Sequence, residues 1–268
     1  MIKSLKYVIS ENIHNLFRIF SIARYELLAD MRESKLGIVW NVLNPLISIL
    51  TYGFVFGLGI RGGKPVNMIA FFDCMIAGVS IWFMLSPCIT GGVNAIYSKR
   101  NIINKMKFPI SILPATVVLK ETFNHLFMLA IVYITLIARG MKPSIYNLQI
   151  IYFLICAMAF SISLSMVTSV LNMFTRDVKK MVSASMRMLM YLTPILWTME
   201  KLPHTMQIIM KLNPLYYIVE GYRDSFFYHG GLLLHYKNMI WFWFVVVILF
   251  SLGSILLHKN RHKFIDLI

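Results

Sequence analysis

This chain of 268 residues is 58% hydrophobic, carries only 14% charged residues and has a mean hydropathy of +0.70. Soluble domains average about 25% charged residues, so this composition excludes an ordinary water-soluble globule. The formal net charge of +15 does not indicate a nucleic-acid-binding protein, because the 26 Lys and Arg residues gather in short segments between apolar runs. In such segments, positive charge indicates which side of the membrane a loop lies on and contacts with anionic lipid headgroups.

A basic amphipathic segment precedes the first apolar run. Between residues 11 and 33, apolar residues recur at steps of three and four, which predicts an amphipathic helix in the cytoplasmic interface. Its charges, including Arg24 and Arg32, face either lipid headgroups or a partner protein. Residues 39–60 contain no charge, and about 20 apolar residues suffice to cross a bilayer as a helix. This apolar segment is longer than the core of a cleaved signal peptide and begins too far from the N-terminus to be one. The chain is therefore predicted to be an integral membrane protein.

Six apolar segments are predicted to cross the membrane as helices, because every backbone polar group in hydrocarbon needs an internal partner. They cover residues 38–60, 69–95, 110–138, 147–174, 181–199 and 238–257. The predicted fold class is an all-α integral membrane protein with a cytoplasmic segment at 1–37, a transmembrane domain at 38–258 and a tail at 259–268. Kinks are expected at Pro45, Pro87 and Pro114.

The loop charges predict the orientation of these spans. With the N-terminus in the cytoplasm, the cytoplasmic segments collect 16 Lys and Arg residues and the outside segments collect 8. Because positive charge accumulates on the cytoplasmic side, both termini are expected in the cytoplasm, with the chain in the plasma membrane.

The basic loop at residues 98–109 is predicted to form a short exposed cytoplasmic helix. It places apolar residues at helical spacing between cations, which favours a docking surface over a hairpin that needs only its charge. The residues concerned are Lys99, Arg100, Ile102, Ile103, Lys105, Met106 and Lys107.

The outside loop at residues 200–237 is apolar but is interrupted by Asn213 and Pro214. Two half-helices that dip into the membrane and return would explain this pattern, since broken helices are tolerated where they face protein or a water-filled cavity. A cap lying on the outer surface is the alternative.

Charged residues inside predicted spans indicate a polar cluster. Lys120 and Glu121 lie within the third span and Arg187 lies within the fifth. Such residues usually face the bundle interior and pair, so Glu121 or a neighbour is expected to meet Arg187, with Asn124 and His125 beside them. Structural pairing and lining of a substrate path both remain open.

Small residues at four-residue spacing predict close helix contacts, within one subunit or between two. They are Ala157, Ser161, Ser165 and Ser169 in the fourth span, and Gly53 and Gly57 in the first.

The sequence contains no motif for catalysis. The nearest lookalike of a phosphate-binding loop, GLGIRGGKP, has no Ser or Thr after Lys64. The three cysteines, Cys74, Cys88 and Cys156, have no metal-site or disulfide spacing and are expected to be packing residues. The chain is therefore predicted to be a non-enzymatic subunit without metal or cofactor, whose energy source lies elsewhere.

Five segments together carry a family resemblance. LGIVWNVLNPL, VFGLGIR, KFPISILP, TPILW and NPLYYIVEGYRDSFF occur in this order between residue 36 and the C-terminal part. In order and spacing they resemble the membrane subunit of ABC-2 type polysaccharide exporters, and most resemble the teichoic acid translocation permeases of Gram-positive bacteria.

The resemblance implies a half-transporter. Two copies of this chain would form the channel above two copies of a separate ATPase subunit, which binds ATP and magnesium. The amphipathic helix and the loop at 99–108 resemble the family's contacts with the ATPase, and the segment after Pro203 resembles re-entrant periplasmic helices.

The resemblance also implies a polymer carried on undecaprenyl diphosphate as the substrate. The substrate path would be lined by aromatic and charged residues. Each of the aromatic residues could alternatively lie in the aromatic belt at the membrane interface or pack in the core. The candidates are Trp82, Phe83, Lys120, Glu121, Arg187, Tyr191, Trp197, Tyr216, Tyr217, Tyr222 and Arg223. The pair Lys120 and Glu121 departs from the family pattern.

Two other functions compete with export. A secondary transporter or channel without an ATPase would need ion-coupling residues, and only Lys120, Glu121, His125 and Arg187 are available. A membrane enzyme such as a lipid glycosyl or acyl transferase would need an exposed acid or His pair.

Overall fold

Helices make up nearly all of the part of the chain that the structure describes. The structure is a computed structural model, and it describes residues 2–32, 37, 39–55, 71–103, 108–197, 199, 202–227 and 236–261. The α-helices are α1 (Ile2–His14), α2 (Leu16–Arg32), α3 (Val39–Tyr52), α4 (Phe71–Gly92), α5 (Ala95–Ser98), α6 (Arg100–Ile103), α7 (Leu113–Ala138), α8 (Gln149–Phe174), α9 (Asp177–Leu192), α10 (His204–Leu212), α11 (Pro214–Phe227) and α12 (Tyr236–Asn260). Short 3-10 helices, η2 (Ile110–Ile112) and η3 (Ile145–Leu148), precede α7 and α8.

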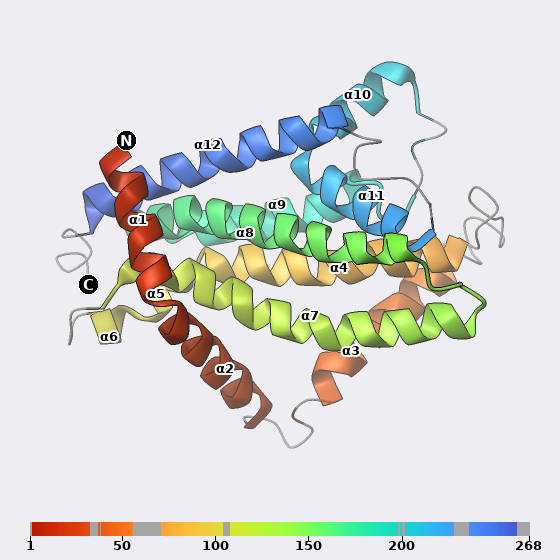
Figure 1. Cartoon of the computed structure of the whole chain (residues 1–268), viewed down its shortest axis with the longest axis horizontal. Helices are drawn as coiled ribbons and strands as arrows, with labels where there is room; N and C mark the ends of the chain where they lie inside the picture. Colours follow the sequence, from red (N-terminus) through yellow and green to blue (C-terminus); the bar gives the residue numbers. More distant parts are fainter. Residues whose placement is uncertain are drawn as a thin grey trace.

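Four long apolar helices run side by side along the bundle (Figure 1). The segments long and apolar enough to cross a membrane are Phe71–Gly92, Ile110–Ala138, Ile145–Phe174 and Tyr236–Asn260. They coincide with the second, third, fourth and sixth predicted spans, so the chain is a multi-pass membrane protein.

The first and fifth predicted spans remain predictions. The first contains α3 and the shorter apolar helix Leu46–Val55, while its last residues, 56–60, lie outside the described residues. The fifth covers only the later part of α9, which starts at Asp177, has 16 residues and ends at Leu192, well before residue 199.

Helix α4 forms the centre of the bundle. It packs against α7, α8, α9 and α11, and 72% of the residues in its most apolar stretch are buried. Pro87 lies inside α4, whereas Pro114 lies in the first turn of α7, where its missing N–H removes no helical hydrogen bond. By contrast, α12 keeps an outer apolar face of Ile240, Phe244 and Val247 exposed, as a helix in contact with lipid would.

The small residues of α8 confirm the predicted helix-contact face and place it within one chain. Ala157, Ser161, Ser165 and Ser169 are all fully buried. Gly92 of α4 lies directly against Ser165, where an added Cβ would overlap the side chain. The three cysteines are free and buried, as expected of packing residues.

The amphipathic region begins earlier than predicted and divides into two helices. Helix α1 crosses the end of α12, and α2 then leaves at an angle and packs against α7 (Figure 1). The Tyr7 and His258 rings are 4.9 Å apart, and Ser111 Oγ donates to Glu11 Oε2 at 2.5 Å. Burial, followed by the neighbouring Glu11 carboxylate, raises the pKa of Tyr7, whose hydroxyl donates to Glu11 Oε1. We call this end of the bundle, with α1, α5 and α6, the α1 end.

At the opposite end, the helix break predicted at Asn213 and Pro214 is present. Helix α10 ends and α11 begins there, with Asn213 Oδ1 accepting from the backbone N–H of Leu215 at 3.0 Å. Asn213 Nδ2 also donates to Thr193 Oγ1 at 3.1 Å, which fixes the break against the turn after α9. Asn213 thus caps the N-terminus of α11, which explains why α11 starts at the next residue, Pro214. Whether α10 and α11 re-enter the membrane remains a prediction.

Candidate functional site

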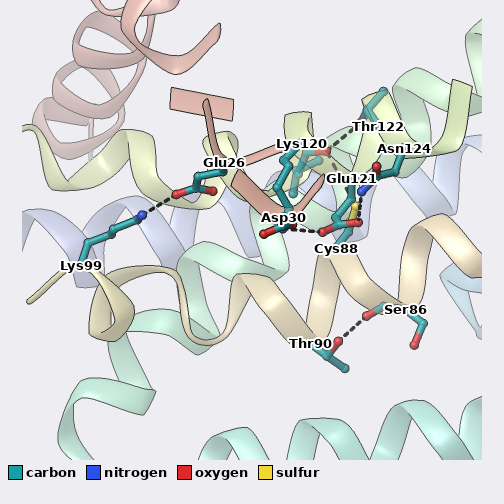
Figure 2. Close-up of polar contacts among 11 residues, drawn as sticks. Glu26, Asp30, Ser86, Cys88, Thr90, Lys99, Lys120, Glu121, Thr122 and Asn124 are labelled. Carbon is teal, nitrogen blue, oxygen red and sulfur yellow. Dashed lines mark hydrogen bonds and ion pairs between the residues drawn. The ribbon is translucent and has the colours of Figure 1, made fainter. Parts of the chain in front are cut away.

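Two segments of the predicted ATPase-coupling surface meet at the α1 end. Lys99, between α5 and α6, forms an ion pair with Glu26 of α2, with 2.6 Å between Nζ and Oε1 (Figure 2). Arg24 and Arg32 of α2 are exposed and so is Ile102, whereas Ile103 is buried. Lys105, Met106 and Lys107 lie outside the described residues. The structure thus ties the basic loop to the amphipathic helix.

Tyr97 lies between two arginines at the same end. The Cζ atom of Arg100 is 4.5 Å from the centre of the Tyr97 ring, and that of Arg176 is 4.6 Å away. Arg176 immediately precedes α9. A guanidinium within about 6 Å of an aromatic ring is attracted to its face. This contact connects the basic loop to the start of α9.

A charged cluster occupies the junction of α2 and α7. Lys120 Nζ lies 2.9 Å from Asp30 Oδ2 and 3.2 Å from Glu121 Oε1. Asn124 Nδ2 donates to Glu121 Oε2 at 3.1 Å (Figure 2). Lys120 therefore bridges two carboxylates, one from each helix.

The expected contact between Glu121 and Arg187 is wrong within this chain. Glu121 pairs with Lys120, and Arg187 is exposed on α9. The physical reason is that α9 is amphipathic and packs through Met186 and Met190, which turns Arg187 away from the bundle.

A polar cavity of about 190 Å³ opens beside this cluster, between α3, α4 and α7. Its lining residues are Trp40, Asn44, Phe83, Glu121, Asn124, His125 and Met128. His125 is 3% exposed and its Nε2 lies 2.8 Å from the Tyr222 hydroxyl of α11. The cavity thus contains two predicted substrate-path residues, Phe83 and Glu121.

The open face of α9, which we define as Met181, Arg187, Met188, Tyr191 and Leu192, is exposed and is not covered by any part of the chain that the structure describes. Tyr191 is 58% exposed and Met188 is 57% exposed. Trp197 is half-buried, and its indole N–H donates to the Tyr191 carbonyl at 2.8 Å. A helix that exposes large apolar side chains along one face requires a lipid or protein partner.

Arg223 holds the end of α9 against α11 and α4. Its guanidinium donates to the carbonyls of Cys74 at 3.2 Å, Pro194 at 2.7 Å and Ile195, and it pairs with Glu220 at 3.3 Å. Only 5% of Arg223 is exposed. The carbonyls of Pro194 and Ile195 need these donors because α9 ends at Leu192, so no following helical turn supplies backbone N–H groups to them.

The remaining predicted path residues are packed inside the chain. Trp82, Tyr216, Tyr217 and Tyr222 are at most 7% exposed. The hydroxyls of Tyr217 and Tyr152 lie 3.2 Å apart, and Tyr152 also accepts from the Trp243 indole N–H at 3.0 Å. In a single chain these aromatic side chains contribute packing and buried hydrogen bonds rather than open surface.

Comparison with known proteins gives the family. The sequence model of the ABC-2 type transporter family matches residues 18–227. The chain belongs to this family. It is 28% identical over 250 residues to an O-antigen export system permease protein RfbA of Klebsiella pneumoniae, covering 92% of this chain and 93% of the relative. A protein of the same name from Myxococcus xanthus is 26% identical over 213 residues, covering 79% of this chain and 80% of the relative.

Family membership establishes the general role of the chain as a membrane transport permease of the type found in polysaccharide export systems. Permeases of this type pair with ATP-binding subunits in exporters.

Sequence reasoning did not identify four partners of the candidate residues: Glu26, Asp30, Tyr97 and Arg176. A signal for the first two was present, because Glu26 and Asp30 are four residues apart and share one face of an amphipathic helix. No comparable signal indicates that Tyr97 and Arg176 meet, since α7 and α8 separate them in the chain.

Proposed function

We propose that this chain is the membrane-spanning subunit of an ATP-driven exporter that moves a lipid-linked surface polysaccharide outward across the plasma membrane. The observation that carries the proposal is the match of the ABC-2 family over residues 18–227, on a helical bundle with four apolar spans. The polymer would be carried on undecaprenyl diphosphate. Teichoic acid is the specific polymer that the sequence resemblance favours, and an O-antigen-type polysaccharide is the one that the relatives' names favour.

The proposed complex contains two copies of this chain and two copies of an ATP-binding subunit, which holds ATP and magnesium. The open face of α9 supports the pairing of two copies, because its exposed apolar side chains need a partner. Arg187 and Tyr191 on this face are then the path residues most accessible to a polymer between the two copies.

The ATP-binding subunit would dock at the α1 end, which we propose is cytoplasmic. The exposed cations Arg18, Arg24 and Arg32 of α2 support this placement, and so do the half-buried Lys99 and Arg100 of the basic loop. The contact of α1 with the end of α12 also supports it, because it puts the first and last helices on one side. Closure of the ATPase would be transmitted from the basic loop to α2 through Glu26 and to α9 through Tyr97 and Arg176.

The test is purification of the tagged chain from native membranes in mild detergent, with identification of stoichiometric partners and assay of ATPase activity. We expect one nucleotide-binding subunit per chain. A chain that purifies alone and without ATPase activity would contradict the proposal and favour a secondary transporter, for which the cluster of Asp30, Lys120 and Glu121 supplies ionisable groups at the junction of α2 and α7.

A further inference from the structure

The cavity between α3, α4 and α7 has the size of a small-ligand subsite. Its volume of about 190 Å³ is well above the roughly 10–15 Å³ that a single water molecule needs. A single sugar ring fits in this space. Ionisable residues in such a location within a membrane bundle usually face a functional path or a hydrated cavity.

The lining combines an apolar wall with a polar wall. Trp40, Phe83 and Met128 supply aromatic and apolar surface, and Asn44, Glu121 and Asn124 supply hydrogen-bonding groups. Trp40 is 41% exposed, so a face of its large amphipathic ring remains available. Small-molecule sites are typically built in this way, with apolar walls and a few polar groups that fix the ligand's orientation.

The charges around the cavity disfavour an anion. Lys120 is shared between Asp30 and Glu121, so the three residues together carry a formal charge of −1 when ionised. Glu121 is the member of this cluster that lines the cavity, and an ionised carboxylate only accepts hydrogen bonds. A ligand that donates hydrogen bonds matches this wall, whereas a phosphate group meets like charge.

His125 ties this wall to α11. Its Nε2 lies 2.8 Å from the Tyr222 hydroxyl, and its Nδ1 is buried, with no hydrogen-bond partner among the residues that the structure describes. Whether Nδ1 donates or accepts depends on the tautomer. His125 therefore orders the wall through its contact with Tyr222 and does not itself present a group to a ligand.

We propose that this cavity is a subsite for one neutral sugar ring of the transported polymer. The ring would lie against Trp40 and donate a hydroxyl hydrogen bond to Glu121. This inference rests on the proposed export function and narrows it, because the site binds the polymer through its sugars and not through its phosphates.

The experiment measures binding by the purified chain in phosphatidylcholine nanodiscs, without an ATPase or ATP. The probes are octyl glucoside and octyl phosphate, which share one alkyl chain, each used below its micelle-forming concentration. The readout is tryptophan fluorescence, to which five tryptophans contribute. Trp40→Phe removes the reporter at the cavity, and Trp241→Phe on α12 is the matched control.

We expect a saturable fluorescence change with octyl glucoside that survives Trp241→Phe and disappears in Trp40→Phe. Glu121→Gln keeps the side-chain shape and should weaken binding about fivefold, the difference between a charged and a neutral acceptor. Octyl phosphate should bind at least tenfold more weakly than octyl glucoside.

Three results would overturn the subsite: no saturable change with octyl glucoside, an unchanged signal in Trp40→Phe, or octyl phosphate binding as tightly as the glucoside. Because no ATPase takes part, failure here is separate from failure of the export proposal, which copurification tests.

Discussion

Lys99 on the basic loop contacts Glu26 on α2, with 2.6 Å between Nζ and Oε1. The pair fixes the loop to a helix that itself packs against the membrane-spanning α7. A movement of either segment is therefore transmitted to the other. The ion pair should matter for coupling to the ATPase more than for the stability of the fold.

Exchanging the two charges should preserve coupling that a single reversal destroys. Lys99→Glu or Glu26→Lys alone places like charges together and should lower substrate-stimulated ATPase activity of the complex, whereas the double exchange should restore it. The partly exposed pair contributes only about 0.2–1 kcal/mol to stability, so the chain should still fold. Lys180→Glu, in the exposed pair with Asp177, is the control. A double exchange as impaired as the single variants would argue against the link.

Reversing all the cations of the basic loop should remove the ATPase. When Lys99, Arg100, Lys105 and Lys107 are replaced by Glu, we expect loss of the copurifying ATP-binding subunit with membrane insertion largely intact. The charges outside the spans contribute to docking, while the apolar spans drive insertion. The ratio of ATPase to chain after purification measures this. Unchanged copurification would show that the loop is not a docking surface.

Tyr97 should act through its ring and not through its hydroxyl. Each cation–ring contact contributes about 0.5–1 kcal/mol at an exposed site, so Tyr97→Leu should loosen Arg100 and Arg176 while Tyr97→Phe should not. We expect ATP-driven transport to fall several-fold in Tyr97→Leu, with the ATPase still bound. Equal transport in the Leu and Phe variants would remove Tyr97 from the coupling route.

Arg223 and Gly78 should behave as one unit. An added Cβ at Gly78 would lie 2.7 Å from Arg223 Nε, so Gly78→Ala displaces the guanidinium from the carbonyls of Pro194 and Ile195. Each buried carbonyl left without a donor costs about 1–3 kcal/mol. Thermal unfolding in detergent should show a large loss for Arg223→Met and for Gly78→Ala, and a double variant less damaged than the sum. Full additivity would mean that the two residues act independently.

Cysteines on the open face of α9 should crosslink two copies of the chain. Met188→Cys and Tyr191→Cys introduce exposed thiols, whereas the three native cysteines are buried and remain unreactive. We expect a disulfide-linked dimer in native membranes at one or both positions. Val247→Cys, on the exposed face of α12, should stay monomeric. A dimer at residue 247 and none on α9 would move the dimer contact to α12.

The sequence was most informative where one local rule decides the structure. The long apolar runs predicted α4, α7, α8 and α12, because only a helix satisfies its backbone in hydrocarbon. The small residues of α8 predicted a contact face, and Asn213 before Pro214 predicted the break between α10 and α11.

Pairing between distant segments was less predictable. The position of Lys120 gave no indication that Asp30 of α2 would approach it, because periodicity defines the faces of a helix without saying which helix covers them. For the same reason the sequence predicts that Arg187 meets Glu121 or a neighbour, although the amphipathic pattern of α9 turns Arg187 outward. The lining of the substrate path by Arg223 stays a prediction, and no sequence pattern indicates its place in this chain as a buried donor to three carbonyls.

The central claim is that ATP hydrolysis by a partner drives polysaccharide through this chain. It is tested most directly in inside-out vesicles that contain the chain, its copurified ATPase and radiolabelled lipid-linked polymer. We predict that polymer becomes protected in the vesicle lumen when ATP and magnesium are added, and not when only an ion gradient is imposed. Protection driven by the ion gradient without ATP would contradict the account.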